Sequence, residues 1–367
     1  MNAGMVSEAG RKSPRLLLCG LDSLYIAYFL DPSGSGLDFD DLAYRKEQLH
    51  HGQGSDFDEI RLGGESFALL PYGGKPYSYT LKNPAFLIRL GENIRPSCHV
   101  QFLSQALWQD GPEFCKSRFL AWCRALRLVA TRPETVSRAD WAFDFHLEGI
   151  DFDSEQFVTS AAKKQVFTEH DRAQTFQIGT SDVVVRVYDK VAEIEQASEK
   201  GWFFDLWGQD RCVWRVEFQI RGERLKRAGI RTLEDLNLLG PDLLREIATH
   251  HTRLCKPSSD SNRSRWPLHP LWQALLEAIA AMPQTGLIAD IQPEKAIDWR
   301  LWNQSKSVYG YLKGMTALVM ERDSLDQPPD LDAALGPIID LIGQHHHPVE
   351  WDADVSKRHA ALRLGQW

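Results

Sequence analysis

The sequence has no long apolar segment. Of its 367 residues 43% are hydrophobic, yet no run reaches the roughly 18 residues of a membrane-spanning helix. The opening stretch, MNAGMVSEAGRKSPRLLLCG, also lacks the apolar core of a secretory signal. We therefore expect a cytoplasmic protein with no membrane partner.

Cysteine pairs of the kind that bind zinc are missing as well. The six cysteines are scattered without a CxxC pair, and Cys115 and Cys123 fall on the apolar stripe of a helical pattern. Since disulfides persist mainly in oxidising compartments, reduced thiols fit the cytoplasm. A structural zinc site is disfavoured.

The chain also lacks a net positive charge. The formal net charge is −8 and the isoelectric point about 5.9, which argues against a general binder of polyanions. One stretch is nevertheless basic, RGERLKRAGIR at residues 221–231. Such a run is either a solvated face or a local groove for an anionic partner.

Short alternating segments dominate most of the chain. Residues 20–30 are typical of a buried strand, and residues 66–102 contain runs broken by PYGGKP and GENIRPS, which are turn signals. A hairpin is predicted around residues 179–182. Residues 231–251 indicate one or two helices, with a break near Gly240–Pro241.

The predicted fold is α+β, an antiparallel sheet flanked by helices, with a C-terminal helical region. We expect four parts along the chain: a disordered tail at 1–19, a catalytic α+β domain at 20–255, a linker at 256–265 and helices at 266–367. The linker is placed at a proline followed by serine, aspartate and asparagine.

Three predicted strands each carry one apolar and one polar side. They are SRADWAFDFH, VVVRVYDK and VWRVEFQIR, and successive residues of a strand point to opposite faces. The polar sides hold the following residues: Arg138, Asp140, Asp144 and His146; Arg186, Tyr188 and Lys190; Arg215, Glu217, Gln219 and Arg221. If the strands pair, these groups share one surface of the sheet.

Two interpretations of this surface remain open. The plainer one is the solvated side of a half-buried antiparallel sheet, with His146 as an exposed strand histidine. In the other, carboxylates two residues apart on one strand, together with one from a neighbouring strand, hold Mg²⁺ or Mn²⁺, which prefer oxygen ligands. Tyr188 is then a nucleophile, because nearby cations stabilise its phenolate. Phosphoryl transfer from DNA to a tyrosine would use all of these groups.

The three segments resemble the R-x-D-x-A-x-D, R-x-Y-x-K and R-x-E-x-Q-x-R motifs of the trans-acting replication initiation factor family, rolling-circle initiators related to relaxases of integrative conjugative elements. They occur here as SRADWAFDF, VRVYDKVAEI and WRVEFQIRGERL, in the family's order. GLDSLYIAYF resembles the family's first strand, and DWRLWNQSKSVYGYLKGM a segment after its catalytic domain. The likeness covers roughly residues 20–320.

The resemblance implies an enzyme that nicks and rejoins one DNA strand at an origin. Tyr188 would attack the scissile phosphate, leaving a 5′-phosphotyrosine and a free 3′-OH, with Lys190 and Arg186 at the phosphate. It further implies Asp140, Asp144 and Glu217 as ligands of Mg²⁺ or Mn²⁺, and Arg138 and Arg215 as groups that orient carboxylates. The His-hydrophobic-His strand of better-known rolling-circle nucleases does not occur.

The expected partner is origin DNA, presented as a hairpin or single strand, with a host helicase and a second copy of the chain as further candidates. We predict that DNA is contacted by a basic group: Arg215, Arg221, Arg224, Lys226 and Arg227. Three alternatives stay open. They are a non-catalytic DNA-binding protein, a metal-dependent phosphodiesterase that acts through water, and an inactive scaffold.

Overall fold

A computed structural model describes residues 13–51, 57–169, 172–198, 200–282 and 293–363. It has two compact units, the first ending at residue 287 and the second starting at residue 288. The second unit consists of helices α9 (Pro293–Asp323), α10 (Leu331–Gly343) and α11 (Pro348–Arg363). No helix in the described ranges is both long enough and apolar enough to cross a bilayer.

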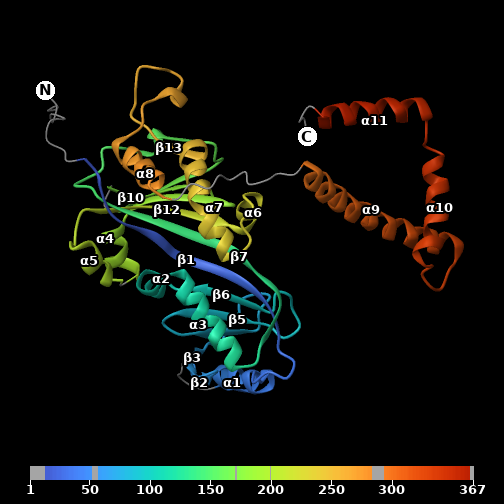
Figure 1. Cartoon of the computed structure of the whole chain (residues 1–367), viewed down its shortest axis with the longest axis horizontal. Coiled ribbons are helices and arrows are strands. Elements are labelled where there is room, and N and C mark those ends of the chain that lie inside the picture. The colour runs from blue at the N-terminus through green and yellow to red at the C-terminus, as the bar shows by residue number, and fades with distance from the viewer. Residues whose placement is uncertain (1–12, 52–56, 170–171, 199, 283–292, 364–367) are drawn as a thin grey trace. The chain divides into compact units, whose positions relative to one another are not determined.

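The first unit is built on one large antiparallel sheet (Figure 1). Two long strands form its centre, β1 (Arg15–Asp31) and β7 (Val129–His146). The strand order over the described residues is β2-β3-β4-β5-β6-β1-β7-β12-β11-β10-β9. The other strands are β2 (Asp58–Leu62), β3 (Glu65–Leu69), β4 (Tyr79–Lys82), β5 (Phe86–Leu90), β6 (Cys98–Phe102), β9 (Lys164–Glu169), β10 (Arg172–Ile178), β11 (Val183–Asp189) and β12 (Val213–Arg221). A separate ladder pairs β8 (Phe157–Thr159) with β13 (Thr252–Leu254).

Helices flank this sheet, so the predicted α+β class is confirmed. Those of the first unit are α1 (Phe39–His51), α2 (Ser104–Asp110), α3 (Pro112–Ala125), α4 (Lys190–Glu193), α5 (Trp202–Trp207), α6 (Gly222–Arg227), α7 (Leu233–Glu246) and α8 (Pro270–Ala280). The hairpin expected around residues 179–182 joins β10 to β11, with Ile178 opposite Val185.

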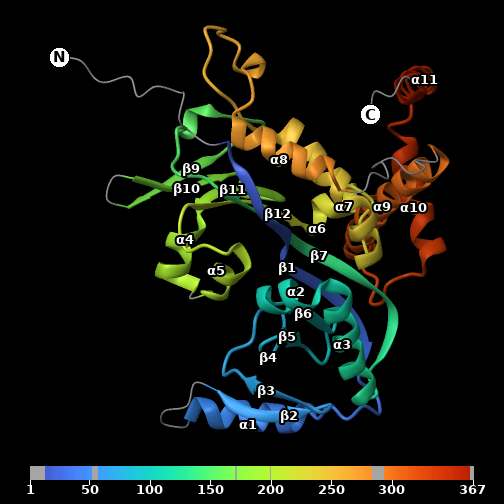
Figure 2. The same cartoon turned by 60° about the vertical axis from the view of Figure 1, so that its left-hand side comes forward.

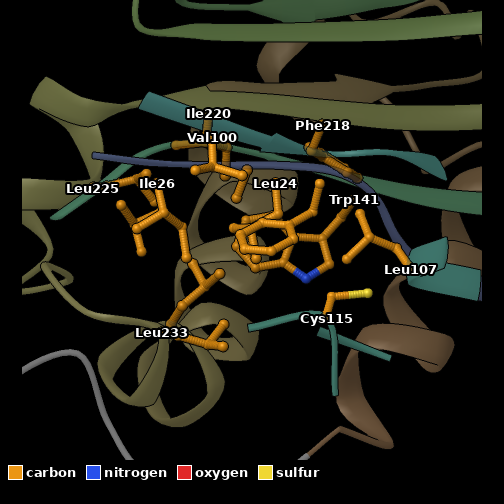
Figure 3. Close-up of a cluster of buried hydrophobic side chains, with 14 of the residues drawn as sticks. Leu24, Ile26, Val100, Leu107, Cys115, Trp141, Phe218, Ile220, Leu225 and Leu233 are labelled. Carbon is orange, nitrogen blue, oxygen red and sulfur yellow. The ribbon is translucent and has the colours of Figure 1, made fainter. Parts of the chain in front are cut away.

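The apolar side of the three predicted strands forms the main core. Phe143 of β7 packs edge-on against Phe218 of β12, with ring centroids 6.0 Å apart, and both are fully buried. Figure 3 shows Trp141 and Phe218 with Leu225 and Leu233 from the helical layer. The alternation of large apolar residues thus identified the buried side correctly.

Helix α7 lies close to the sheet and continues through Pro241, where a break was expected. Its Gly240 faces Trp141, and a Cβ atom added there would lie 2.8 Å from Cζ2 of the indole. The glycine at this position therefore allows the close approach of helix and sheet, and does not end the helix.

The division between the units falls later in the chain than the predicted linker. Residues 256–265 form a loop that begins and ends in the first unit. At its base, the Lys256 amide donates a hydrogen bond to the Pro267 carbonyl, and Cys255 forms an isolated antiparallel β-bridge with Leu268. Helix α8 then buries Leu271 and Trp272 completely in the main core. The polar composition predicted a loop, but the apolar face of α8 belongs to the first unit.

The expected tail also differs from the structure. Residues 1–12 lie outside the described residues, whereas residues 15–19 form the start of β1 and pair with β7. Arg15 stands opposite His146, at the far end of that strand.

Candidate active site

The three motif strands are neighbours in the sheet, in the order β7-β12-β11 (Figure 2). Glu217 of β12 stands opposite Arg186 of β11, and Arg215 stands between Tyr188 of β11 and Asp144 of β7. Helix α4 follows β11 at once, because the Asp189 side chain caps it by accepting hydrogen bonds from the next backbone amides. Local pairing thus brings the polar residues of all three motifs to one surface.

The central contact is between Tyr188 and Glu217. The phenol hydroxyl donates a hydrogen bond to Oε2 of Glu217 over 2.9 Å, and the tyrosine is only 8% exposed. Burial, and then the adjacent Glu217 carboxylate, raise the pKa of Tyr188 well above its usual value. The hydroxyl is therefore a neutral donor in the resting protein, with a carboxylate placed to accept its proton.

The second oxygen of Glu217 holds Arg186. Nη1 of this arginine lies 2.9 Å from Oε1 of Glu217 and 3.1 Å from the side-chain oxygen of Gln219. Its Nε donates to Gln177 of β10 over 3.0 Å. One carboxylate thus connects the phenol to a guanidinium that is fixed from three sides.

Lys190 lies beside the tyrosine ring. Its ammonium is 5.8 Å from the ring centroid of Tyr188 and 5.3 Å from that of Phe203, and it pairs with Glu193 one turn along α4. Burial, and then the charge of Arg215, lower the pKa of Lys190 from its usual value. This cation is held within the site and not on its rim.

Arg215 forms the buried ionic centre of the unit. It donates to both oxygens of Asp144, over 2.6 and 2.9 Å, and its Nη1 lies 3.1 Å from Asp22 of β1. Arg215 and Asp144 are both fully buried, and Trp207 of α5 donates to Asp144 over 2.9 Å. The predicted DNA contact of Arg215 needs correction, because this side chain is fully buried. Asp144 accepts hydrogen bonds from Arg215 and Trp207, and its role as a metal ligand stays a prediction.

Asp22 is a site residue that the motifs did not indicate. Ser104 and Trp108 donate to its Oδ1 over 2.8 and 2.9 Å. Burial alone would raise its pKa, but Arg215 and then Lys200 hold the pKa of Asp22 well below its usual range. The available signal was an isolated carboxylate within the apolar strand GLDSLYIAYFL.

Asp140 is the third predicted ligand. Arg138, two residues before it on β7, donates from Nε to Oδ1 over 2.8 Å. Burial outweighs this contact and raises the pKa of Asp140 to about 6, and the charges of Glu217 and Asp22 add to the effect. The carboxyl is only 4% exposed.

These groups line a pocket of about 340 Å³. It contains four cations, Arg138, Arg186, Lys190 and Lys200. It also contains four carboxylates, Asp22, Asp140, Glu193 and Glu217. Tyr188, Ser23 and Thr175 complete the lining. Six predicted residues therefore gather here with five that were not predicted as site residues: Asp22, Ser23, Thr175, Glu193 and Lys200.

The predicted metal ligands do not form a metal-binding cluster. Within the described chain, no group of three or more His, Cys, Asp or Glu side chains has an arrangement that could hold a metal ion. Asp144 faces Arg215, Asp140 faces Arg138, and Glu217 faces both Tyr188 and Arg186. Each would have to exchange a donor for the ion, so the Mg²⁺ or Mn²⁺ requirement stays a prediction from the sequence.

The remaining predicted residues lie apart from this pocket. His146 contacts Gln209, with 3.0 Å between Nδ1 and Nε2, and is absent from the lining. In the basic group, Arg224 pairs with Glu246, Lys226 with Glu223, and Arg227 with Asp182. Arg221 and Lys226 line a different groove, of about 630 Å³.

Comparisons with known proteins add little to this picture. Neither a family nor a curated protein matches the sequence. Among solved structures, that of a rolling circle replication initiator protein from Geobacillus stearothermophilus is similar in part, with 17% identity and a TM-score of 0.39. The likeness covers 72% of this chain and 96% of that one. This similarity is too low to support a function. A function is therefore argued below from the chemistry of the pocket alone.

Proposed function

We propose that this chain nicks and rejoins one strand of DNA at a replication origin, with Tyr188 as nucleophile and Glu217 as its base. The observation that carries the proposal is the 2.9 Å hydrogen bond from the phenol to Glu217, inside a pocket that also holds Arg186 and Lys190. A phenol, a proton acceptor and cations within one small pocket are what attack on a phosphodiester requires.

The transfer consists of one bond made and one bond broken. Glu217 takes the phenolic proton while Oη of Tyr188 forms a bond to phosphorus. The bond from phosphorus to the 3′ oxygen breaks, and that oxygen takes a proton from water. The products are a 5′-phosphotyrosine and a free 3′-OH, which can prime synthesis, and the reverse transfer rejoins the strand.

The cations have separate tasks in this proposal. Arg186 is fixed by Glu217, Gln219 and Gln177, so it can meet a phosphate oxygen with little loss of freedom. The ammonium of Lys190 lies beside the Tyr188 ring and stabilises the phenolate as it forms. Because neither task needs a divalent ion, no step is assigned to one.

The depth of the nucleophile restricts the substrate. Tyr188 is 8% exposed, so a backbone phosphate has to enter the pocket to reach it. A stacked duplex cannot bring its backbone into such a site, whereas a hairpin loop or a single strand can. Origin DNA in one of these forms is thus the proposed partner, and a helicase or a second copy of the chain would join it later.

Covalent capture tests the proposal. The protein is incubated with single-stranded and hairpin oligonucleotides from the DNA that flanks its own gene, with and without Mn²⁺, and the products are separated under denaturing conditions. We expect an adduct with the unmodified protein and none with Tyr188→Phe, which still binds the DNA. Tyr72→Phe, an exposed tyrosine outside the pocket, is the matched control.

Other outcomes identify the competing functions. Cleavage to free 5′-phosphate ends without an adduct would mean a phosphodiesterase that acts through water. Binding without any cleavage would mean a DNA-binding protein, for which the paired charges Arg138–Asp140 and Arg186–Glu217 would serve as a polar surface. An adduct formed by Tyr188→Phe would remove this residue from the role of nucleophile.

A further inference from the structure

A row of aromatic rings leads away from the pocket across the sheet. Tyr25 of β1 and His99 of β6 have ring centroids 5.9 Å apart, and Tyr77, just before β4, lies 6.0 Å from His99. The ring planes are tilted by 42° and 36°, so the rings are not stacked on one another. All three side chains are half-buried.

This row starts at the rim of the Tyr188 pocket. The guanidinium carbon of Arg138, which lines the pocket, lies 4.9 Å from the ring centroid of Tyr25. Tyr25 stands opposite Arg138 in the ladder, so their side chains share one face of the sheet. Leu24 and Ile26, on either side of Tyr25, point into the core instead.

Hydrogen bonds fix the middle ring. Nε2 of His99 lies 2.9 Å from Oγ of Ser137, which itself donates to the backbone oxygen of Tyr25 over 3.2 Å. Burial, and then the charge of Arg89, lower the pKa of His99 to about 4. The ring is therefore uncharged at neutral pH and offers a flat face, not a cation.

Cations accompany the row. Arg89 of β5 stands opposite His99, and no ion pair to a carboxylate involves it in the part of the chain that the structure describes. Ser137 also lines the groove of about 630 Å³. The charged residues there are the cations Arg132, Arg221 and Lys226 and the carboxylates Asp182 and Glu223. The guanidinium carbon of Arg132 lies 3.4 Å from the ring centroid of Phe29, which also lines this groove.

We propose that Tyr25, His99 and Tyr77 form a stacking row for the unpaired bases next to the scissile phosphate. The inference rests on the proposed function, since it takes the occupant of the pocket to be single-stranded DNA. A sheet face that combines half-exposed rings with cations at their edges is suited to single strands, because bases stack on the rings and phosphates meet the cations. Duplex DNA keeps its bases stacked on each other and cannot use such a row.

Binding of fluorescent oligothymidine tests the stacking row. Tyr188→Phe serves as the background, so that cleavage does not disturb the measurement. Tyr25→Ala and Tyr77→Ala should each weaken single-strand binding by about 5- to 100-fold, the effect of one lost base stack. Tyr25→Phe should retain full affinity, because the ring and not the hydroxyl stacks. Tyr44→Ala, an exposed tyrosine on α1, is the control and should not change the affinity.

A second readout guards against loss of folding. Each variant is checked by its thermal unfolding midpoint, and 2-aminopurine placed beside the scissile phosphate should be quenched by the background protein and less by the Ala variants. Folded Ala variants with unchanged affinity and quenching would overturn the stacking row, while covalent adduct formation by the unmodified protein would still stand. If the background protein bound no single strand at all, both the row and the proposed function would fall.

Discussion

The hydroxyl of Tyr188 on β11 lies 2.9 Å from Oε2 of Glu217 on the adjacent strand β12. The two residues stand diagonally across the ladder, since Tyr188 is opposite Arg215 and Arg186 is opposite Glu217. A single carboxylate can therefore accept the phenolic proton and at the same time hold Arg186, the arginine that we propose for the phosphate.

Glu217→Gln should lower the rate of adduct formation by about 10²- to 10⁴-fold, the usual contribution of a general base. The amide can still accept a hydrogen bond from Tyr188, so DNA binding should remain close to that of the unmodified protein. Single-turnover cleavage and equilibrium binding measure the two effects. Glu223→Gln on α6, an exposed glutamate outside the pocket, is the control, and an unchanged rate in Glu217→Gln would exclude the base role.

Asp144→Asn should act on stability and not on metal binding. It leaves the fully buried Arg215 without its bidentate partner, which for a buried pair costs about 3–5 kcal/mol in the free energy of unfolding. Denaturant unfolding measures this loss. Asp182→Asn removes the exposed pair with Arg227 and should cost at most about 1 kcal/mol. Equal losses in both variants, or a specific loss of Mn²⁺ affinity in Asp144→Asn, would contradict the structure.

Asp140 should make stability fall between about pH 4 and pH 6. Its pKa is raised to about 6 in the folded protein against the usual value of 3.8, so the folded state binds more protons in this window. Stability therefore decreases as the pH rises through it and levels off above pH 6. Chemical unfolding at several pH values should show this slope in the unmodified protein and a flatter one in Asp140→Asn. The same slope in both would assign the effect to another group.

Gly240→Ala tests the contact between α7 and the sheet. Alanine favours a helix, but its Cβ would lie 2.8 Å from Trp141, and such overpacking costs about 1–3 kcal/mol. Thermal unfolding should show a lower midpoint. Gly310→Ala on α9, where an added Cβ meets nothing within 4 Å, should show no loss. A midpoint that rises in Gly240→Ala would mean that helix propensity outweighs the contact.

Strand periodicity was sufficient to identify much of the sheet. The alternation in SRADWAFDFH and VWRVEFQIR assigned Trp141, Phe143 and Phe218 to the core, and the structure buries all three. It could not tell that the opposite side is also covered. There Phe203 and Trp207 of α5 form a second apolar cluster with Val213, and this cluster encloses Asp144 and Arg215. A period-two pattern shows which side of a strand each residue lies on, but it does not show whether that side is exposed to solvent.

The sequence could not predict which charged residues pair with each other within the site. Asp140, Asp144 and Glu217 have the same chemistry and similar spacing, yet each accepts from a different donor. Which carboxylate serves the tyrosine depends on strand register, and register depends on contacts far apart in the chain. Asp22 lies in the segment that resembles the family's first strand, but that resemblance named no site residue there, and Lys200 lies in a segment without a recognised motif. Only the folded chain brings both to the pocket.

The Arg215 bridge reaches carboxylates on two other strands, Asp144 of β7 and Asp22 of β1. If β12 slipped by one position, the guanidinium would point to the other side of the sheet, among buried phenylalanine and tryptophan rings. A shifted strand register would thus be destabilised by an unpaired buried charge. The bridge therefore favours the register in which Tyr188 and Glu217 become neighbours.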